Sequence, residues 1–580
     1  MEAPSRRWER LLPGIAVLRD YEWPWLRGDL LAGLTVAAYL IPQVMAYADI
    51  AGLAPVAGLW AILAPIAIYA VFGASRQLSI GPESTTALMT AVAVGAMVGQ
   101  AGADRYAEVC ALLAIAVGVV CLAGWVARLG FLANLLSRPV LVGYLVGVAV
   151  LMIVSQLGKV SGIAPEEGHP LYAAWSVLVR LPAAHLPTLA LALVALAALY
   201  LLRWWRPRWP GPLLVLLASA AAVAAFGLQA YGVRTIGEVP QGLPGFRVPD
   251  LANLSLWALM PAALGIAIVG YSDNVLTARA FAATKRQRVD ADQELLALGL
   301  ANVSSGLFHG FPVSSSSSRT VIGDAVGSRT QVYSLVALGC VVATLLVAGP
   351  VLAGFPTAAL GALVIYAATR LIDLAEIARI ARFRYSELVL SLATAVAVVA
   401  FDVLTGIGLA IALSLLDVIR RMSHPHDGIL GYVPGVAGMH DVEDYPQATQ
   451  VPGLVVYRYD SPLFFGNAEN FLSRALEAVR DAAGPVHWFV LNAEANVEID
   501  LTAVDTLELL REALVSRGVT FALARVKQET RDELAAAGFV ARVGQDHVFA
   551  TLPTAVAAYA RWHRDRFGEF PDGIPGGVVT

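Results

Sequence analysis

Two ionisable residues stand inside long apolar stretches of this 580-residue chain. Asp273 lies in an apolar stretch that begins near Trp257, and Arg319 directly follows five consecutive serines, Ser314 to Ser318. A guanidinium fork suits an oxyanion, and a carboxylate near it can take up and release a proton. These residue types predict a site that binds an anion and exchanges a proton, provided that the fold brings them together.

The polar landmarks of the chain recur at a single spacing. Residues 82–86 (PESTT) resemble residues 312–316 (PVSSS), so that a proline and small hydroxyl residues head an apolar stretch in both places. Gln43, deep in the first apolar stretch, and Asp273 are separated by the same 230 residues as the two prolines. The shared spacing predicts two weakly similar halves. An odd number of spans in each half makes the halves inverted, as in many secondary transporters whose interrupted helices meet at the binding site.

The two prolines predict two half-helices with converging N-termini. Proline suits the first turn of a helix, where its missing N–H is of little consequence. Free N–H groups and the helix dipole then direct partial positive charge at one point, where an anion binds. We expect hydroxyl groups and one guanidinium to complete the anion site: Ser84, Thr85, Ser315, Ser316, Ser317, Ser318 and Arg319. The alternatives are that the serines form a helix-packing face and that the arginine extends to the membrane interface.

Asp273 is the expected partner of Arg319. It is ionised while the site is empty, and it takes up a proton when an anion enters, because two negative charges then compete for one cation. This exchange predicts that proton entry is coupled to anion entry. Glu83, near the start of the first half-helix, either shares this role or only favours the positive end of its own helix.

The composition is that of a protein solvated by lipid. The chain is 58% hydrophobic and only 14% charged, against about 25% charged in soluble domains. A span needs about 20 apolar residues, and residues 30–420 hold material for about twelve to fourteen spans. The apolar runs lack strand alternation, so helices are expected rather than a barrel. The basic, aromatic first 29 residues lack the apolar core of a signal peptide and predict a leader near the lipid headgroups.

Charged residues return after Arg420, and the chain divides there. We expect five segments: a cytoplasmic N-terminal segment (1–27), a transmembrane anion-transport domain (28–422), a linker rich in glycine and proline (423–440), a soluble domain (441–562) and a C-terminal tail (563–580).

Arginine and lysine are distributed unevenly over the expected loops. With fourteen spans and both ends inside, sixteen of these residues fall in inner loops, and five fall in outer loops: Arg105, Lys159, Arg180, Arg234 and Arg247. Positive charge is retained on the cytoplasmic side. The distribution predicts a multi-pass protein of the inner (cytoplasmic) membrane with both termini in the cytoplasm.

Three stretches resemble the SulP family of sulfate permeases and their animal anion-exchanger relatives, and are most similar to actinobacterial, mycobacterial-type members. They are residues 30–47 (LLAGLTVAAYLIPQVMAY), 79–84 (SIGPES) and 310–320 (GFPVSSSSSRT). The resemblance covers about Trp25 to Ala560. It implies an α-helical polytopic membrane protein with about 14 transmembrane helices in two inverted seven-helix repeats, divided into core and gate domains. It also implies an elevator-like motion of the core and a homodimer in the lipid bilayer.

The same resemblance implies roles for single residues. Gln43 and Tyr47 match first-span positions that line the anion site, although Tyr47 could equally only pack. Ser315 to Ser318 match the start of the tenth span, Arg319 matches its anion-attracting arginine, and Asp273 matches the coupling carboxylate of the eighth span.

Thr277 matches a hydroxyl of the sodium site in the cyanobacterial bicarbonate members, or only bonds to its own helix backbone. Those members lack the arginine that this chain has at Arg319. An acid combined with an arginine resembles the proton-coupled sulfate branch, so sulfate ranks above bicarbonate as the expected cargo.

The soluble segment resembles the STAS domain of anti-sigma-factor antagonists. Residues 488–493 (WFVLNA), 497–507 (VEIDLTAVDTL) and 519–524 (VTFALA) follow its order of strand, loop, helix and strand. The resemblance implies a cytoplasmic α/β domain with a regulatory role and an unidentified cytoplasmic partner. Thr502 lies at the position of the antagonists' phosphorylated serine, and it is also a candidate N-cap.

Three functions remain in competition. The leading hypothesis is secondary active uptake of sulfate with a proton. A transporter of the same family that carries bicarbonate or a dicarboxylate is the first alternative. The alternative of another class is a regulated anion channel, or an anion sensor that signals through the STAS domain. The sequence has no nucleophile–base pair, phosphate loop, metal-ligand cluster or basic patch, so we expect no enzyme activity, cofactor, metal or nucleic-acid partner.

Overall fold

The computed structural model describes residues 11–98, 103–131, 137–166, 169–206, 209–237, 242–249, 256–285, 287–401 and 403–574. The first ten residues of the expected N-terminal segment and the last six of the expected tail lie outside the described residues. The chain forms two compact units, residues 1–414 and residues 415–580, each of which is described by itself.

The first unit is helical. Six described stretches are long and apolar enough to cross a membrane: α3 (Trp25–Ile50), α6 (Ala103–Val126), α7 (Arg138–Ser161), α9 (Leu186–Trp205), α11 (Leu256–Thr284), and Thr357–Phe383, which contains α16 (Thr357–Thr369) and α17 (Leu374–Phe383). Shorter apolar helices are α4 (Val56–Phe72), α5 (Ser84–Val98), α8 (Pro170–Val179), α10 (Gly211–Ala225), α14 (Val332–Val347) and α18 (Tyr385–Ala400). The other helices are α2 (Pro13–Arg19), η2 (Leu181–Ala183), α12 (Ala291–Leu307), α13 (Ser317–Val326), α15 (Gly349–Ala353) and α19 (Val403–Ser423).

The two halves of the helical unit repeat the same packing. α3 packs against α14, and its counterpart α11 packs against α6. α4 also packs against α14, as α12 packs against α6. Farther along the chain, α7 packs against α18 as α16 packs against α9. Because each helix of one half packs on a helix of the other half, the packing is that of two intertwined inverted repeats, as the sequence predicted.

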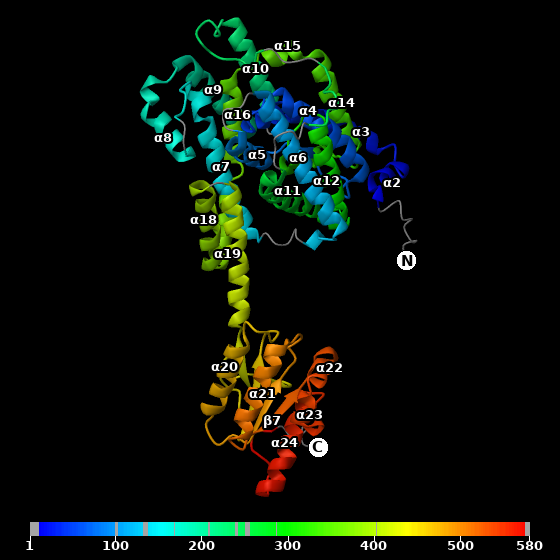
Figure 1. Cartoon of the computed structure of the whole chain (residues 1–580), viewed down its shortest axis with the longest axis vertical. Coiled ribbons are helices and arrows are strands. Elements are labelled where there is room, and N and C mark those ends of the chain that lie inside the picture. Colours follow the sequence, from blue (N-terminus) through cyan, green and yellow to red (C-terminus); the bar gives the residue numbers. More distant parts are fainter. Residues whose placement is uncertain are drawn as a thin grey trace. The chain divides into compact units, whose positions relative to one another are not determined.

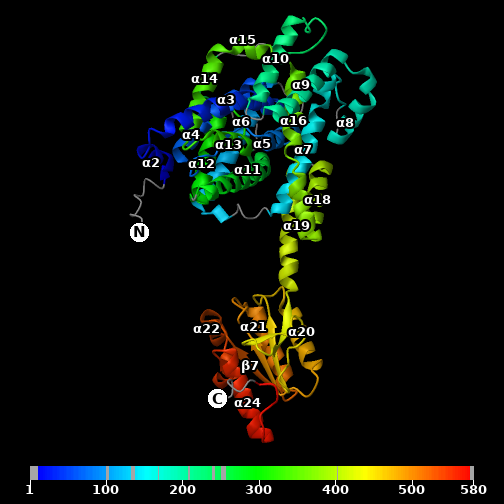
Figure 2. The same ribbon diagram turned by 180° about the vertical axis from the view of Figure 1, so that it is seen from behind.

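The helices form two bundles. We call α3–α6 with α11–α14 the core bundle, and α7, α9, α16 and α18 the gate bundle; Figures 1 and 2 show them on opposite sides of the helical unit. In lipid the hydrophobic effect does not drive helices together, so they associate through close packing. Small residues allow this because they let the helix backbones approach closely. A Cβ atom on Gly143 of α7 would lie 1.9 Å from the backbone oxygen of Ser391 in α18, so only glycine fits there.

Two short strands bring the half-helices together. β1 (Ile80–Gly81) pairs antiparallel with β2 (Ser314–Ser315), with Ile80 opposite Ser315. β1 leads into α5 and β2 leads into α13. Gly81 has φ of +148°, and a Cβ atom there would lie 2.6 Å from the side chain of Ile62, so this crossing requires glycine. The predicted meeting of two half-helices is therefore present in the fold.

The prolines act differently from the expectation. Pro82 lies two residues before α5, and Pro312 lies five residues before α13, so neither occupies the first turn of its helix. Proline also restricts the residue that precedes it to extended conformations. The two prolines therefore favour the extended segments before the half-helices, and not the helix starts themselves.

The second unit is an α/β domain with a six-stranded sheet in the order β4-β3-β5-β6-β7-β8. β3 pairs antiparallel with β4 and β5, and the other strand pairs are parallel. The strands are β3 (Asp427–Tyr432), β4 (Met439–Asp441), β5 (Leu454–Tyr459), β6 (Trp488–Asn492), β7 (Thr520–Ala524) and β8 (Val548–Phe549). The helices are α20 (Ala468–Arg480), α21 (Leu501–Val515), α22 (Gln528–Ala536), α23 (Phe539–Val543), η3 (Gln545–His547) and α24 (Leu552–Phe567).

Alternation along the parallel strands builds two apolar layers. Successive strand residues point to opposite faces of a sheet. Tyr457, Phe489 and Phe521 pack with α20, α21 and α23 on one face. Val456 and Val490 belong to the layer that contains α24 on the other face. The sheet is therefore buried on both sides, as a parallel sheet requires.

The expected linker and domain end are both corrected by the structure. β3 and most of β4 lie within the segment 423–440, and β3 pairs with the central strand β5. α24 continues to Phe567, beyond the expected end at residue 562. Pro434, Gly435 and Gly438 lie in the turn between β3 and β4, whereas Gly428 and Gly431 lie within β3. The segment is not a free linker, because strand pairing satisfies its backbone.

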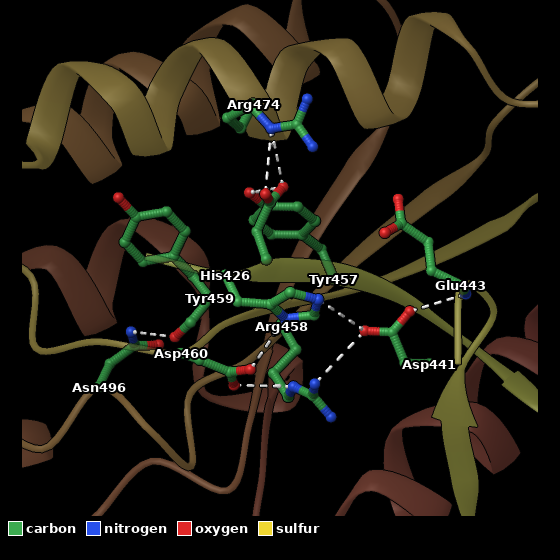
Figure 3. Close-up of polar contacts among 10 residues, drawn as sticks. His426, Asp441, Glu443, Tyr457, Arg458, Tyr459, Asp460, Arg474 and Asn496 are labelled. Atoms are coloured by element: carbon green, nitrogen blue, oxygen red, sulfur yellow. Dashed lines mark hydrogen bonds and ion pairs between the residues drawn. The ribbon is translucent and has the colours of Figure 1, made fainter. Parts of the chain in front are cut away.

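A polar network fixes this hairpin to the sheet (Figure 3). The buried carboxylate of Asp441 accepts from the guanidinium of Arg458 (3.4 Å), and Nε of Arg458 lies 2.8 Å from a carboxylate oxygen of Asp460. His426, just before β3, lies 3.3 Å from Asp460. On the other side of β3, Arg474 of α20 binds both carboxylate oxygens of Asp427 at 3.0 and 3.1 Å.

Candidate functional site

A cavity of about 410 Å³ lies between the core and gate bundles. The core bundle contributes its polar wall: Gln43, Tyr47, Glu83, Ser84, Thr85, Thr86, Asp273 and Ser314 to Ser318. The gate bundle contributes a mainly apolar wall: Leu141, Tyr144, Leu145, Leu363, Val364, Tyr366 and Ala367. The cavity therefore has one face that can bind a polar ligand and one face along which that ligand can slide.

Asp273 projects from the middle of α11 onto the polar wall. The hydroxyl of Ser315, in β2, donates to its carboxylate oxygen Oδ2 at 2.8 Å. One turn farther along α11, the hydroxyl of Thr277 lies 2.9 Å from that of Ser317. Thr277 itself is not among the residues that line the cavity. These two contacts fix the second half-helix against α11, so that the carboxylate and the serine run occupy one surface.

The two half-helix N-termini differ. Glu83 caps α5, because its carboxylate accepts from the backbone N–H of Thr85 (2.7 Å) and from the hydroxyl of Ser84. No side chain caps α13, whose first residues Ser317 and Ser318 line the cavity. The sequence predicted that both termini offer free N–H groups. The structure corrects this: a carboxylate already occupies the first terminus, and the second one is available to an anion.

Arg319 lies behind the cavity wall. Its side chain is fully buried and does not line the cavity. The guanidinium donates to the Ser79 hydroxyl (3.2 Å), the Pro82 carbonyl (3.0 Å) and the Gln43 amide oxygen (3.3 Å). Its Nη2 has no hydrogen-bond partner among the described residues.

The expected pair of Arg319 and Asp273 is not formed. Asp273 is bonded to Ser315 and Arg319 to three uncharged groups, and within the described part of the chain neither has an oppositely charged partner within ion-pair distance. The reason is geometric, because Arg319 turns from α13 toward the β1 side of the crossing while Asp273 faces the cavity. The positive charge thus acts on the cavity through intervening groups.

Gln43 connects the arginine to the cavity. Its amide oxygen accepts from Arg319, and its amide nitrogen donates to the Tyr47 hydroxyl (2.8 Å) and lies 3.4 Å from the Ser318 hydroxyl. An amide bound at its oxygen by a cation presents its N–H groups outward. Gln43 and Tyr47 therefore both line the cavity, and Gln43 also contacts Arg319 behind it, a contact that the sequence alone did not suggest.

Several cavity residues were missed by sequence reasoning. Tyr144 and Tyr366 belong to apolar gate helices and are not distinguished there from ordinary packing residues. Arg370 also lines the cavity, directly after α16, and no hydrogen bond or ion pair of its side chain is found within the described residues. In the sequence, Arg370 was noted only as one of the basic residues of the inner loops. That basic charge next to an apolar helix is the feature that could have drawn attention to it.

A second buried carboxylate, Glu294 of α12, was also missed. It is fully buried and accepts from Tyr69 (3.0 Å), from the backbone N–H groups of Ala74 and Ser75, and from Asn274. Four donors make it a structural clamp on the turn after α4, away from the cavity wall. The rule that draws attention to Asp273, that carboxylates inside apolar helices are rare, also applies to Glu294.

Thr502 lies in the second unit, on the exposed surface at the start of α21. It is not the N-cap, because Asp500 occupies that position and accepts from the backbone N–H of Ala503 at 2.8 Å. Among the described residues, no group of three His, Cys, Asp or Glu side chains is placed to hold a metal ion.

Comparison with known proteins assigns both units. Residues 26–394 match the sulfate permease family, and residues 445–555 match the STAS domain. The chain is 57% identical over 549 residues to a probable sulfate transporter of Mycobacterium tuberculosis, covering 95% of this chain and 98% of the relative. It is 32% identical over 479 residues to human solute carrier family 26 member 6, covering 78% of this chain and 62% of the relative.

Solved structures share the fold. The murine solute carrier 26 family member A9 anion transporter, described in an inward-facing state, superposes with a TM-score of 0.88 at 23% identity, covering 97% of this chain and 96% of that one. The transmembrane domain of a cyanobacterial bicarbonate transporter superposes with a TM-score of 0.58 at 21% identity, covering 68% and 98%. The family match, the 57% identical relative and the polar cavity between two bundles agree: the chain belongs to the sulfate permease family of anion transporters, membrane proteins with a C-terminal STAS domain.

Proposed function

We propose that this protein is a secondary active transporter that takes up sulfate together with a proton, by an elevator-type alternating-access mechanism. The observation that carries the proposal is the position of Asp273, on the polar wall of the cavity and bonded to Ser315 beside the uncapped N-terminus of α13. The name of the mycobacterial relative as a probable sulfate transporter supports the choice of cargo.

The anion would be held mainly by α13. Free N–H groups at Ser317 and Ser318 and the hydroxyls of Ser315 and Ser316 can donate to oxyanion atoms at the cavity surface. Arg319 would contribute its charge from behind, through Gln43, and would not bind the anion directly. A preorganised set of neutral donors backed by one buried charge binds an oxyanion without forming a permanent ion pair.

Protons would be coupled through repulsion between carboxylates and cargo. Asp273 and Glu83 both face the cavity. A divalent anion that arrives beside an ionised Asp273 is repelled unless the carboxylate takes up a proton. The Glu83 carboxylate is already engaged with the α5 terminus, so we assign it the secondary part in coupling.

The two walls of the cavity support movement of one bundle past the other. The polar groups that would hold the anion belong to the core bundle, and the gate wall offers mainly apolar side chains. Motion of the core bundle would therefore carry the whole binding set with it, without breaking bonds between the cargo and the gate.

The remaining assignments extend from the family. We propose a homodimer in the inner membrane with both termini in the cytoplasm, a regulatory rather than pathway-forming role for the STAS domain, and an unidentified cytoplasmic partner for it. The exposed position of Thr502 is compatible with phosphorylation. An anion channel or an anion sensor that signals through STAS is the alternative of another class.

One observation favours a second candidate function, transport of bicarbonate or a dicarboxylate coupled to Na⁺. Asp273, Thr277, Ser315 and Ser317 gather oxygen atoms at one place, which suits a small hard cation such as Na⁺. Coupling to Na⁺ would accompany bicarbonate, or a dicarboxylate, as the cargo.

Labelled sulfate uptake into proteoliposomes tests the proposal. An inward proton gradient should stimulate uptake severalfold in the wild type, and Na⁺ in place of the gradient should not. Protein that is folded by size exclusion but takes up no sulfate in either condition would contradict sulfate as cargo, and uptake of labelled bicarbonate with Na⁺ would then identify the second candidate. Single-channel currents in planar bilayers would instead indicate a channel.

A further inference from the structure

An ion pair joins the two bundles at one end of the cavity. Lys159, in the last turn of α7, contacts the carboxylate of Asp49, near the end of α3. α3 belongs to the core bundle and α7 to the gate bundle. The side chains are 33% and 23% exposed, so the pair is partly shielded from water.

The course of α16 shows where this pair lies along the cavity. A Cβ atom on Gly361, near the start of α16, would lie 3.5 Å from Cβ of Lys159. Residues that follow, Leu363, Val364, Tyr366 and Ala367, line the cavity, and Arg370 lines it beyond the end of the helix. The ion pair and Arg370 therefore mark opposite ends of the cavity.

The course of α3 agrees. Tyr39, Gln43 and Tyr47 line the cavity in succession, and Asp49 comes next along the helix. Apolar side chains of the gate helices are fully buried near this end, among them Met152 of α7 and Leu360 of α16. The Asp49–Lys159 contact shows that the two bundles touch at this end of the cavity.

We propose that the Asp49–Lys159 pair is a latch that keeps this end of the cavity closed. Opening at this end separates the core bundle from the gate bundle, and so separates the two charges. A partly buried pair resists separation until both charges are hydrated again, and an isolated charge left in that position is unfavourable. The latch therefore favours the conformation that is open at the Arg370 end.

This inference rests on the alternating access proposed above, but not on the cargo or the coupled ion. With the topology proposed above, the latch lies on the outer side of the membrane and Arg370 on the cytoplasmic side. Breaking the latch should increase the time that the cavity spends open to the outside, whichever anion it carries.

Chemical labelling of a cavity cysteine measures that opening directly. Val364→Cys places a thiol on the cavity wall, and Cys340→Ala removes the half-buried native thiol, whereas Cys110 and Cys121 are buried. A membrane-impermeant maleimide is added outside right-side-out vesicles. We expect Lys159→Ala and Asp49→Asn to raise the labelling rate at least fivefold, because each removes the attraction that holds the bundles together.

Two further variants make the result specific. The charge exchange Asp49→Lys with Lys159→Asp should return the rate to near that of the intact latch. Arg180→Ala breaks an ion pair with Glu166 (3.7 Å) that does not join the two bundles, and it should leave the rate unchanged.

The possible outcomes distinguish failure of the latch from failure of alternating access. Equal, measurable labelling in all variants would overturn the latch while alternating access stands. A complete absence of labelling from outside in every variant, with normal labelling from inside, would overturn alternating access itself. Faster labelling in the single variants that the charge exchange fails to reverse would show a general loss of packing and would also overturn the latch.

Discussion

The hydroxyl of Ser315 donates to the carboxylate of Asp273 across 2.8 Å, and this bond joins the centre of α11 to the strand that leads into α13. A neutral donor, and not a cation, is thus the fixed partner of the carboxylate. A group held in this way keeps one position whether it is ionised or protonated, since the serine can donate to the carboxylate and accept from the acid. This property suits a site that exchanges a proton during each cycle.

Asp273→Asn should abolish the stimulation of sulfate uptake by an inward proton gradient, because an amide cannot take up the proton. Exchange of internal for external sulfate without a gradient should continue, since Asn keeps the bond to Ser315. Counterflow and gradient-driven uptake measured on the same proteoliposomes check this prediction. A gradient response of wild-type size in the variant would remove Asp273 from the coupling step.

Arg319→Lys should weaken sulfate binding about tenfold or more, although the formal charge is kept. A lysine cannot reach Ser79, Pro82 and Gln43 together, and loss of a hydrogen bond to a charged group is worth about 1.5–3 kcal/mol. Radioligand binding in membranes gives the affinity. An unchanged affinity would show that the arginine acts only as a point charge.

Gln43→Leu should weaken binding less than loss of the arginine, but it should also change selectivity. Leucine removes both the link to Arg319 and the N–H groups that face Tyr47 and Ser318. Gln43→Glu, of similar size but negatively charged, should be worse than leucine because it repels the cargo. Competition of labelled sulfate binding by other anions measures both affinity and selectivity. A variant with the affinity and selectivity of the wild type would contradict the proposal that Gln43 links Arg319 to the anion.

The STAS domain should lose part of its stability as the pH falls below 4.5, the ordinary pKa of a glutamate carboxyl. Hydrogen bonds from Arg511, and also from Arg542, hold the pKa of Glu508 below its ordinary value of 4.5. A carboxyl whose pKa is lowered on folding stabilises the fold above its unfolded pKa, and this contribution is lost as the pH falls through the folded value. Because the side chain is 19% exposed, solvent limits the contribution to about 0.5–1 kcal/mol.

Glu508→Gln provides the matched control for that prediction. Hydrogen exchange of α21 in the full-length protein, corrected for intrinsic rates, should be faster in the variant than in the wild type at pH 7. The difference should shrink as the pH falls below 4.5 and through the lowered pKa of Glu508, because the wild-type carboxyl then becomes protonated. A difference that is independent of pH would assign the effect to packing.

Truncation after Ser423 should leave sulfate binding in membranes, because α19 ends at that residue and the cavity is lined entirely by earlier residues. The maximal uptake rate should change, since we propose that the STAS domain regulates it. Loss of binding from a truncated protein that is inserted and folded would show that the domain contributes to the site.

The sequence by itself determined the class of the protein and pointed to many of the residues that line its cavity. Long uncharged runs require lipid-spanning helices, because only these satisfy backbone polar groups in a bilayer. Repeated polar landmarks located the crossing of the two halves, and Gln43, Asp273, Glu83 and the serine run all line the cavity. These residues could be identified from the sequence because inserting polar groups into apolar segments is unfavourable, so such groups are conspicuous there.

Only the tertiary structure decided which groups meet. The sequence predicted that Arg319 and Asp273 form a pair. The direction in which each side chain leaves its helix separates them, and the residue pattern does not reveal that direction. The gate wall and the Asp49–Lys159 contact depend on packing between bundles that are distant in the chain. Likewise, glycine and proline between residues 423 and 440 suit both a linker and a hairpin, and only pairing with β5 distinguishes the two.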